Sequence, residues 1–173
     1  MSAFTDWRSV AVFRDLSDRD LELVREVFGT RRVEAGQNLI TEGEEGDELF
    51  ILIHGKVRIS KSMLLGNIPV PLLATEDPRK VLAVLDDSQY PLFGEIALID
   101  RDTRSATIHV LEDSEFLVTD RDRFFELARR EPSLGFHLLL AVTRRLAATV
   151  RRNNQELVKL TTALALALDR AAR

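Results

Sequence analysis

The longest uninterrupted pattern in this 173-residue sequence is its C-terminal stretch, which has no proline after Pro132 and a single glycine, Gly135. Read as one helix, those ~40 residues would extend about 60 Å, far beyond the mean helix of a globular protein. A helix of that length needs a partner, because most helical stability in proteins comes from packing an apolar face. The stretch therefore predicts a long C-terminal helix with something packed along it.

The spacing of apolar side chains indicates what that partner is. Residues recur alternately four and three positions apart, as in the seam of a coiled coil: Leu139, Thr143, Leu146, Val150, Asn153, Leu157, Leu160, Leu164, Ala167 and Ala171. We expect the first three turns to pack on the chain's own body and the remainder to form a homodimer. The predicted dimer contacts are Val150, Asn153, Leu157, Leu160 and Leu164, with Asn153 as the polar position that fixes register.

A short amphipathic helix is predicted near the N-terminus. Ser17 followed by Asp20 is typical of a helix start, and the apolar residues from Leu21 to Phe28 recur at helical spacing. Gly29 is expected to close this helix.

Between residues 31 and 119 the pattern changes to short runs rich in β-branched residues and separated by glycines. The runs recur at the interval typical of an antiparallel sandwich or barrel. The predicted strands are Leu49–Ile53, Lys56–Ser60, Arg79–Leu85, Arg104–Leu111 and Glu115–Thr119, followed by a helix over Arg121–Arg130. The chain is therefore expected to be mainly β with flanking helices.

Composition narrows the function classes. There is no cysteine, so disulfides, thiolate metal sites and cysteine nucleophiles are excluded. The three histidines stand apart among apolar residues, which argues against a metal centre and against a cupin-type metalloenzyme. The longest apolar stretches, such as 134–142, fall short of the ~20 residues that cross a bilayer, and no signal peptide is visible. A cytoplasmic location without membrane association is the expectation.

Charge is unevenly distributed along the chain. Residues 1–120 hold 13 Lys and Arg against 23 Asp and Glu, whereas residues 121–173 hold 11 against 5. The basic C-terminal part raises the possibility of nucleic-acid binding, but its arginine pairs at 129–130, 144–145 and 151–152 alternate with apolar residues, as on a solvated helix face. The acidic turn at 42–48 does not have the oxygen spacing of a calcium loop and favours a β corner.

The most informative segment is FGEIALIDRDTRSAT at residues 93–107. Gly94 permits close backbone approach, and the N–H groups at the start of the apolar turn after it suit an anion. Arg104 can return to the same place as a bidentate clamp for phosphate, and Glu95 suits a donor such as a sugar hydroxyl. Residue chemistry alone leaves two interpretations open, a pocket for a phosphate and a hydroxyl or an ordinary Glu–Arg surface pair.

At these residues the sequence resembles the cyclic nucleotide-binding domain family of the bacterial catabolite activator protein and the regulatory subunits of protein kinase A. The phosphate-binding cassette of that family reads F-G-E-[LI]-A-L, a short variable loop and R-[SAT]-A, which Phe93–Leu98 and Arg104–Ala106 match. The resemblance extends upstream to Gly36, to 42–50 and to 54–57. We refer to residues 93–106 below as the cassette.

The resemblance implies an antiparallel β-roll, a double-stranded β-helix of the jelly-roll type, with a short N-terminal helix and a long C-terminal dimerisation helix. Residues 1–130 would form the binding β-roll with its helix, and 131–173 the helix that serves as lid and coiled coil. Residues 63–78 form a longer connection than the family needs and are expected to be an extended hairpin. The loop at 86–92 lacks the glycines usual in the family and is slightly longer.

The resemblance also implies roles for individual residues. Glu95 would accept a hydrogen bond from the ribose 2′-hydroxyl, and Arg104 would pair with the cyclic phosphate. Gly94, Ser105 and the backbone N–H groups of Ile96 and Ala97 would complete the phosphate site. Thr149 aligns with the first residue of a Thr-Ser pair that contacts adenine, while Val150 cannot make the second contact.

The function that follows is a non-enzymatic receptor for a cyclic mononucleotide, with cAMP favoured over cGMP and no cofactor. Ligand would draw the C-terminal helix over the pocket, change the geometry of the dimer and signal to an effector protein that the sequence does not name. The alternative is a transcription regulator of the catabolite activator type, truncated or lacking its helix-turn-helix domain. DNA binding is not expected, because 173 residues leave no room for such a domain. An intact pocket that serves another ligand also stays open.

Overall fold

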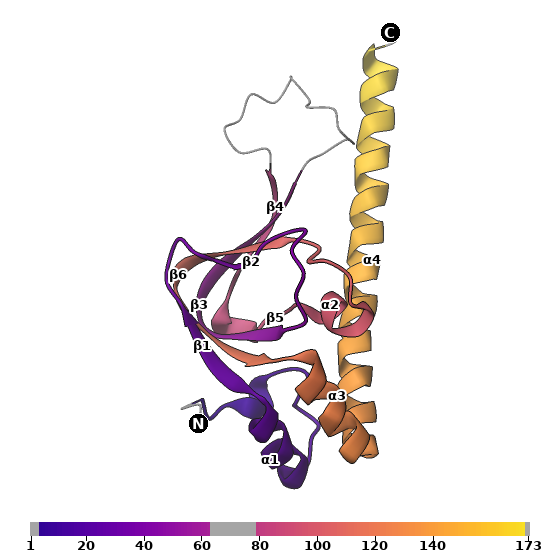
Figure 1. Cartoon of the computed structure of the whole chain (residues 1–173). Coiled ribbons are helices and arrows are strands. Elements are labelled where there is room, and N and C mark those ends of the chain that lie inside the picture. Colours follow the sequence, from indigo (N-terminus) through magenta and orange to yellow (C-terminus); the bar gives the residue numbers. More distant parts are fainter. Residues whose placement is uncertain (1–3, 63–78, 172–173) are drawn as a thin grey trace.

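The computed structural model describes residues 4–62 and 79–171 and shows a β domain beside a single long helix (Figure 1). The predicted hairpin at 63–78 lies outside the described residues. The elements in chain order are η1 (Trp7–Ser9), α1 (Asp18–Val27), β1 (Gly29–Val33), β2 (Asn38–Ile40), β3 (Leu49–Ser62), β4 (Arg79–Asp86), η2 (Asp87–Gln89), β5 (Leu92–Phe93), α2 (Glu95–Asp100), β6 (Thr107–Thr119), α3 (Arg121–Arg130) and α4 (Pro132–Ala171).

The strands form an antiparallel sheet in the order β1-β6-β3-β4, with β2 also paired to β6 and β5 to β3. The register of β3 against β6 shifts around Gly55, which has a φ of 104°. A Cβ there would lie 2.2 Å from the Ser114 hydroxyl oxygen, so only glycine allows the two strands to approach at this bend. Bent long strands roll the sheet up, which confirms the predicted mainly β fold with flanking helices.

Two apolar cores lie on opposite faces of β3, as the period of two in a strand requires. Leu49 and Ile51 point to the core under the helices, which also contains Trp7, Phe13, Leu98, Phe124 and Leu138. Phe50 and Leu52 point into the roll and pack with Phe93, Ile108, Val110 and Phe116. The cassette lies where the cores meet, because Leu92 of β5 belongs to the first and Phe93 to the second.

The helix predicted near the N-terminus is confirmed as α1, with one correction at its end. The Ser17 hydroxyl accepts a hydrogen bond from the Asp20 N–H, as its spacing predicted. Gly29 does not close the helix, however. The helix ends at Val27, and Phe28 is extended. Gly29 begins β1 opposite Val118, because its backbone pairs with β6.

Two predicted strand boundaries are also corrected. Leu49–Ile53 and Lys56–Ser60 are parts of one strand, β3, and the segments predicted at Arg104–Leu111 and Glu115–Thr119 are joined in β6. The strand continues past residues 112–114 because the buried Ser114 hydroxyl donates to the Glu112 carbonyl and accepts from the Lys56 N–H. Arg104 lies before β6, where its backbone pairs with the turn at Gly43 and Glu44 instead.

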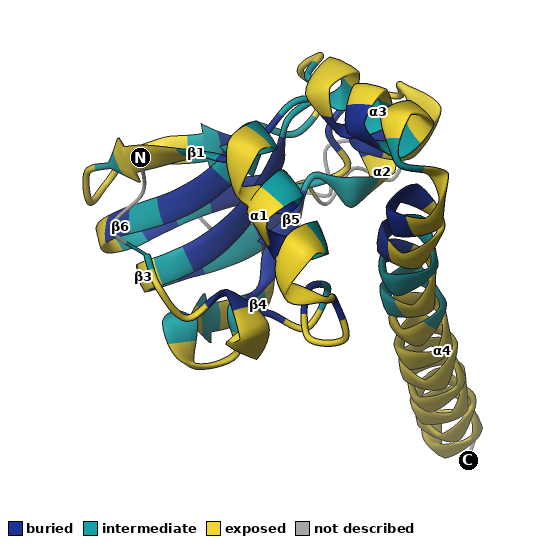
Figure 2. Cartoon of the chain, turned by 90° about the horizontal axis from the view of Figure 1, so that it is seen from below, coloured by how far each residue is buried: buried dark blue, intermediate teal, exposed yellow. Residues whose placement is uncertain are grey.

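The long C-terminal helix is confirmed as α4, 40 residues from Pro132 to Ala171. Its first turns pack on the domain through Leu134, Gly135, Leu138 and Val142, which are buried. Gly135 is needed there, since a Cβ would lie 2.7 Å from the Ala128 Cα of α3. From residue 148 onward every described residue of α4 is exposed, which Figure 2 shows as one continuous yellow rod.

Candidate functional site

The cassette begins with a tight turn between β5 and α2. Gly94 has a φ of 87° and no side chain to cap the helix that follows. A Cβ at this position would lie 2.4 Å from the Glu48 carbonyl oxygen and 2.7 Å from Arg104 Nη1. Gly94 is therefore required both by its backbone conformation and by the close approach of the Glu48 carbonyl and the Arg104 guanidinium.

Arg104 is the buried charge of this site, with 7% of its surface exposed. Its Nη1 donates to the Glu48 carbonyl oxygen at 2.8 Å, and the guanidinium lies 5.8 Å from the centre of the Phe50 ring. On its other side a Cβ at Gly46 would lie 2.7 Å from Nε and Nη2. The guanidinium thus occupies a slot between two glycines, Gly46 and Gly94.

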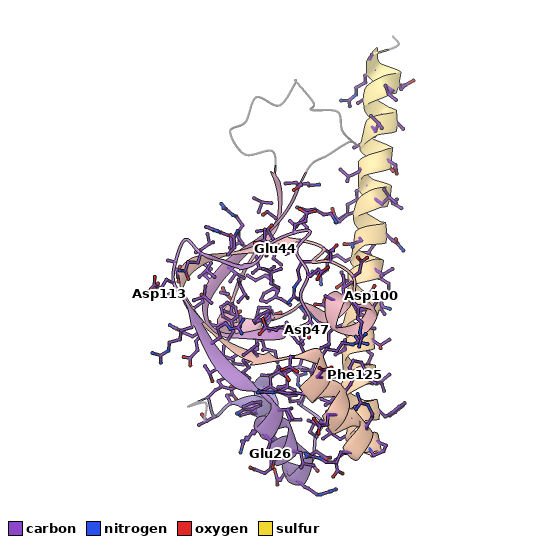
Figure 3. The ribbon with its side chains drawn as sticks, in the orientation of Figure 1. Glu26, Glu44, Asp47, Asp100, Asp113 and Phe125 are labelled. Carbon is purple, nitrogen blue, oxygen red and sulfur yellow. The ribbon has the colours of Figure 1, made fainter. Side chains whose placement is uncertain are left out.

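The slot is held in place by the acidic turn at 42–48. The Arg104 N–H donates to the Glu44 carbonyl and the Gly43 N–H donates to the Arg104 carbonyl, both at 2.9 Å. Glu48 is fixed in turn by Arg31, whose guanidinium donates to both carboxylate oxygens at 2.6 and 2.9 Å. In Figure 3, Glu44 and Asp47 mark this turn on the side of the roll nearer α4.

Burial lowers the pKa of the Arg104 guanidinium from its ordinary value, and the nearby carboxylates of Glu48 and Asp47 oppose that change. Among the described residues, no carboxylate lies within ion-pair distance of Arg104. A buried cation with one carbonyl partner retains unused donors, and an anion that accepted from them would recover part of the desolvation cost.

Glu95 is the second charged group of the cassette and is half-buried. Burial raises the pKa of its carboxyl, while its own backbone N–H and the Arg145 guanidinium act in the opposite direction. Arg145 lies on α4, and its Nη2 donates to the Leu92 carbonyl of β5 at 2.9 Å. Burial lowers the pKa of Arg145 in the same way, with Glu95 opposing. Glu95 and Arg145 therefore compensate one another at the junction of α2, β5 and α4.

The structure brings some of the predicted site residues together and separates others. Gly94 and Arg104 are in contact, and Ser105, next to Arg104, is exposed. Ile96 is 40% exposed at the start of α2, whereas Ala97 is buried. Thr149 is exposed on α4, and no hydrogen bond among the described residues joins it to the cassette.

Arg145, Glu48 and Gly46 were missed as site residues by the sequence analysis. Arg145 is one helical turn before Thr149, so helical spacing could have placed both on the same face. The sequence predicts Gly46 and Glu48 only as part of a β corner. Their contact with Arg104 spans more than 50 residues of sequence, and local patterns carry no signal for it.

The described residues contain no candidate for a membrane-spanning helix or for a metal centre. None of the described helices is long and apolar enough to cross a membrane. Within residues 4–62 and 79–171, no group of three or more acidic residues or histidines could hold a metal ion. A cavity of about 290 Å³ lies outside the cassette, and its lining includes Val10, Asp15, Tyr90, Leu92 and Arg144.

Comparison with known proteins agrees with this geometry. The family model for "Cyclic nucleotide-binding domain" matches residues 30–131, which include the turn at 42–48 and the whole cassette. The chain belongs to the cyclic nucleotide-binding domain family. Like other members of this family of regulatory sensor domains, it has a β-roll fold.

The family resemblance spans bacterial receptors and eukaryotic kinases. The chain is 30% identical over 135 residues to the cyclic AMP receptor protein of Thermus thermophilus, covering 78% of this chain and 56% of that protein. It is 34% identical over 118 residues to human cGMP-dependent protein kinase 2, covering 68% of this chain and 14% of the kinase. The crystal structure of the Thermus thermophilus catabolite activator protein aligns with a TM-score of 0.71 at 28% identity, over 87% of this chain and 63% of that one. The chain thus spans about half the length of the receptor protein.

Proposed function

We propose that this cyclic nucleotide-binding domain is a non-enzymatic receptor in which the cassette binds the cyclic phosphate and ribose of its ligand. The observation that carries the proposal is Arg104, a buried guanidinium without an ion-pair partner among the described residues. A phosphate diester carries one negative charge and presents two oxygens that a guanidinium fork can contact. The Gly46–Gly94 slot keeps that fork rigid, which lowers the entropy lost on binding.

The remaining contacts are assigned by position. Glu95 would accept from the ribose 2′-hydroxyl, and Ser105, exposed beside Arg104, would donate to the phosphate. The backbone N–H groups of Ile96 and Ala97, in the first turn of α2, would complete the phosphate site together with Gly94. Arg145 would compensate the charge of Glu95 from α4.

The ligand we favour is cAMP, with cGMP as the competitor. Thr149 retains the first of the two adenine contacts implied by the family motif, and Val150 replaces the second. Similarity to a cyclic AMP receptor protein supports adenine, and similarity to a cGMP-dependent kinase keeps guanine in the comparison. Because Thr149 is exposed and has no bond to the cassette, its contact with a base would require the ligand to bridge from the cassette to α4.

A calorimetric titration with cAMP and with cGMP tests this function. Heat is expected with at least one ligand, with a stoichiometry of one per chain and tighter binding of cAMP. Linear 5′-AMP is the control, because its extra charge and open ribose phosphate do not fit a site built for a cyclic diester. The absence of heat with both cyclic nucleotides at high micromolar concentration would overturn the proposal.

Replacement of Glu95 by glutamine is expected to stabilise the unliganded protein while weakening binding. A raised carboxyl pKa means that the folded state holds the proton more tightly than the unfolded state. Its favourable contribution to folding is complete below the ordinary glutamate pKa and is lost as pH rises through the raised value. The E95Q variant should therefore have the larger free energy of unfolding at neutral pH, a difference that shrinks as pH falls.

The affinity of E95Q should fall about tenfold, because a neutral amide oxygen accepts more weakly from the 2′-hydroxyl than a carboxylate does. Urea unfolding at pH 7 and at acidic pH, together with calorimetry, measures both effects. Glu45→Gln on the exposed acidic turn is the matched control. Equal destabilisation of both variants, or unchanged affinity of E95Q, would contradict the role assigned to Glu95.

We further propose that residues 1–130 bind the ligand and that 131–173 form the lid and the coiled coil of a cytoplasmic homodimer. The side chains of Val150, Leu157, Leu160 and Leu164 support this, since each is between 56% and 60% exposed in the single chain. Leucines spaced along one stripe of a helix gain most from burial against an identical stripe. Ligand binding would shift α4, and the altered dimer would be read by an effector protein.

DNA binding by a regulator of the catabolite activator type remains the alternative for the whole protein. Arg144, Arg151 and Arg152 are exposed on α4 and offer positive charge. Arg145 does not, because it is directed to Leu92. A band retarded with mixed duplex DNA at physiological salt would favour this alternative.

A further inference from the structure

One side chain outside the cassette holds the far end of the cassette helix. Arg121, the first residue of α3, donates from Nη1 to the carbonyl oxygens of Leu98 and Ile99, the latter at 2.9 Å. These carbonyls belong to the last turn of α2, which ends at Asp100. The last carbonyls of a helix have no partner within it and carry partial negative charge, so a guanidinium at this place satisfies both needs.

Arg121 is itself held from behind. Its guanidinium lies 4.6 Å from the centre of the Phe125 ring, one turn further along α3. Phe125 packs on Phe124 and against the core that Leu98 of α2 also enters. Figure 3 shows Asp100, at the end of α2, directly above Phe125 on α3. The guanidinium therefore lies between the end of α2 and an aromatic ring of α3.

The length of α2 makes this contact important for the ligand. With six residues the helix is only about 9 Å long, so its two ends cannot be oriented independently. Its first turn carries Glu95 and the N–H groups of Ile96 and Ala97, and its last turn is the part that Arg121 holds. Its N-terminus has no side-chain cap. The side chain of Arg121 thus makes the main side-chain hydrogen bonds to the backbone of α2 among the described residues.

We propose that Arg121 is a positioning residue for ligand binding, which fixes the orientation of α2 against α3 so that the ligand groups of the cassette stay in place. This inference rests on the proposed function. Arg121 is assigned no contact with the ligand. It acts through the Leu98 and Ile99 carbonyls, and α3, which packs against α4, supplies the support.

The first arm of the test needs no ligand. Amide hydrogen exchange of α2 is compared in the wild-type protein, in Arg121→Met and in Arg123→Met. Arg123 lies in the same turn of α3 and pairs only with Asp120 among the described residues, so this control removes the same charge without touching α2. Exchange at Leu98 and Arg101 should be about tenfold faster in R121M alone, with amides of β6 unchanged.

The second arm measures cAMP and cGMP binding by calorimetry. We expect R121M to bind about tenfold more weakly than wild type, R123M to stay within about twofold, and R121K to recover part of the loss because it keeps a charged donor. Recovery by lysine separates positioning from simple loss of packing. Thermal unfolding of each variant identifies one that fails to fold, in which case R121K carries the comparison with wild type.

The outcomes distinguish this inference from the function on which it rests. If the wild-type protein binds neither nucleotide, the proposed function fails, and the exchange arm alone decides whether Arg121 holds α2. If wild type binds and R121M has the same affinity or the same α2 exchange as R123M, the positioning role is overturned. Faster exchange confined to α2 together with weaker binding supports it.

Discussion

Replacement of Arg104 by alanine is expected to lower the affinity for cyclic nucleotide by at least about 100-fold, because the ligand phosphate would be buried without its counter-charge. The guanidinium is already placed in the unliganded protein, between Gly46 and Gly94 and on the Glu48 carbonyl. The native protein therefore needs little reorganisation of Arg104 to contact the phosphate, and the alanine variant loses this contact entirely. Calorimetry with cAMP measures the loss.

Removing the charge of Arg104 should leave the stability of the folded protein nearly unchanged or increase it. Burial lowers the pKa of Arg104, which means that the folded protein is a poor environment for this cation before ligand arrives. Arg104→Met, which keeps the aliphatic packing near Phe50, is expected to retain the wild-type midpoint of thermal unfolding or exceed it. Affinity lost while stability is kept would identify Arg104 as a binding residue.

The matched control is Arg32→Met on β1, whose side chain is 85% exposed. It removes the same charge from the acidic part of the chain and should leave affinity within about twofold, since exposed charges are well screened. If R32M lost as much affinity as R104M, general electrostatic attraction would explain binding better than a clamp. Binding by R104M at wild-type strength would refute the assigned phosphate contact.

The second large effect is expected on the oligomeric state. The double variant Leu160→Glu and Leu164→Glu should turn the proposed dimer into a monomer, raising its dissociation constant by about 1,000-fold or more. Each buried leucine contributes about 1.5–3 kcal/mol, and four are lost from a symmetric pair of helices. Glutamates would also face glutamates across the two-fold axis. Sedimentation equilibrium over a range of protein concentrations measures the change.

Val158→Glu provides the control for the dimer. Val158 is 64% exposed, as much as the seam leucines, but its place in the heptad is on the outward side of the helix. It should leave the dimer intact. A wild-type protein that sediments as a monomer, or a V158E variant that dissociates as readily as the seam variant, would rule out the proposed interface.

The sequence predicted those parts of the fold in which local chemistry decides the conformation. Ser17 and Asp20 act within one helical turn, and the heptad pattern needs only the period of α4. Strand β1 was not predicted, because its middle residues Thr30, Arg31 and Arg32 are exposed and polar and it exists through pairing with β6. In β1 these exposed polar residues leave no hydrophobic alternation to detect.

The same distinction applies to the candidate site. Gly94, Glu95 and Arg104 could be predicted because one continuous segment carries them. The groups that support them could not, since Glu48 meets Arg104 across 56 residues and Arg145 meets Leu92 across 53. Arg121 reaches Ile99 over 22 residues from another helix. Such contacts join residues that are far apart in the sequence, and the periodicity of a single sequence carries no signal for them.

The backbone contact between Gly135 and Ala128 has a mechanical consequence. A Cβ at Gly135 would lie 2.7 Å from both the Cα and the Cβ of Ala128, so α4 is closely packed on α3 at this point, and we expect a rotation of α3 to carry α4 with it. From residue 135 to Ala171 the helix extends about 54 Å at 1.5 Å per residue. A tilt of about 10° at that pivot would move the tip by about 9 Å. Such a tilt would make the exposed part of α4 a lever, because a small adjustment at the domain would become a displacement about as large as the diameter of a helix.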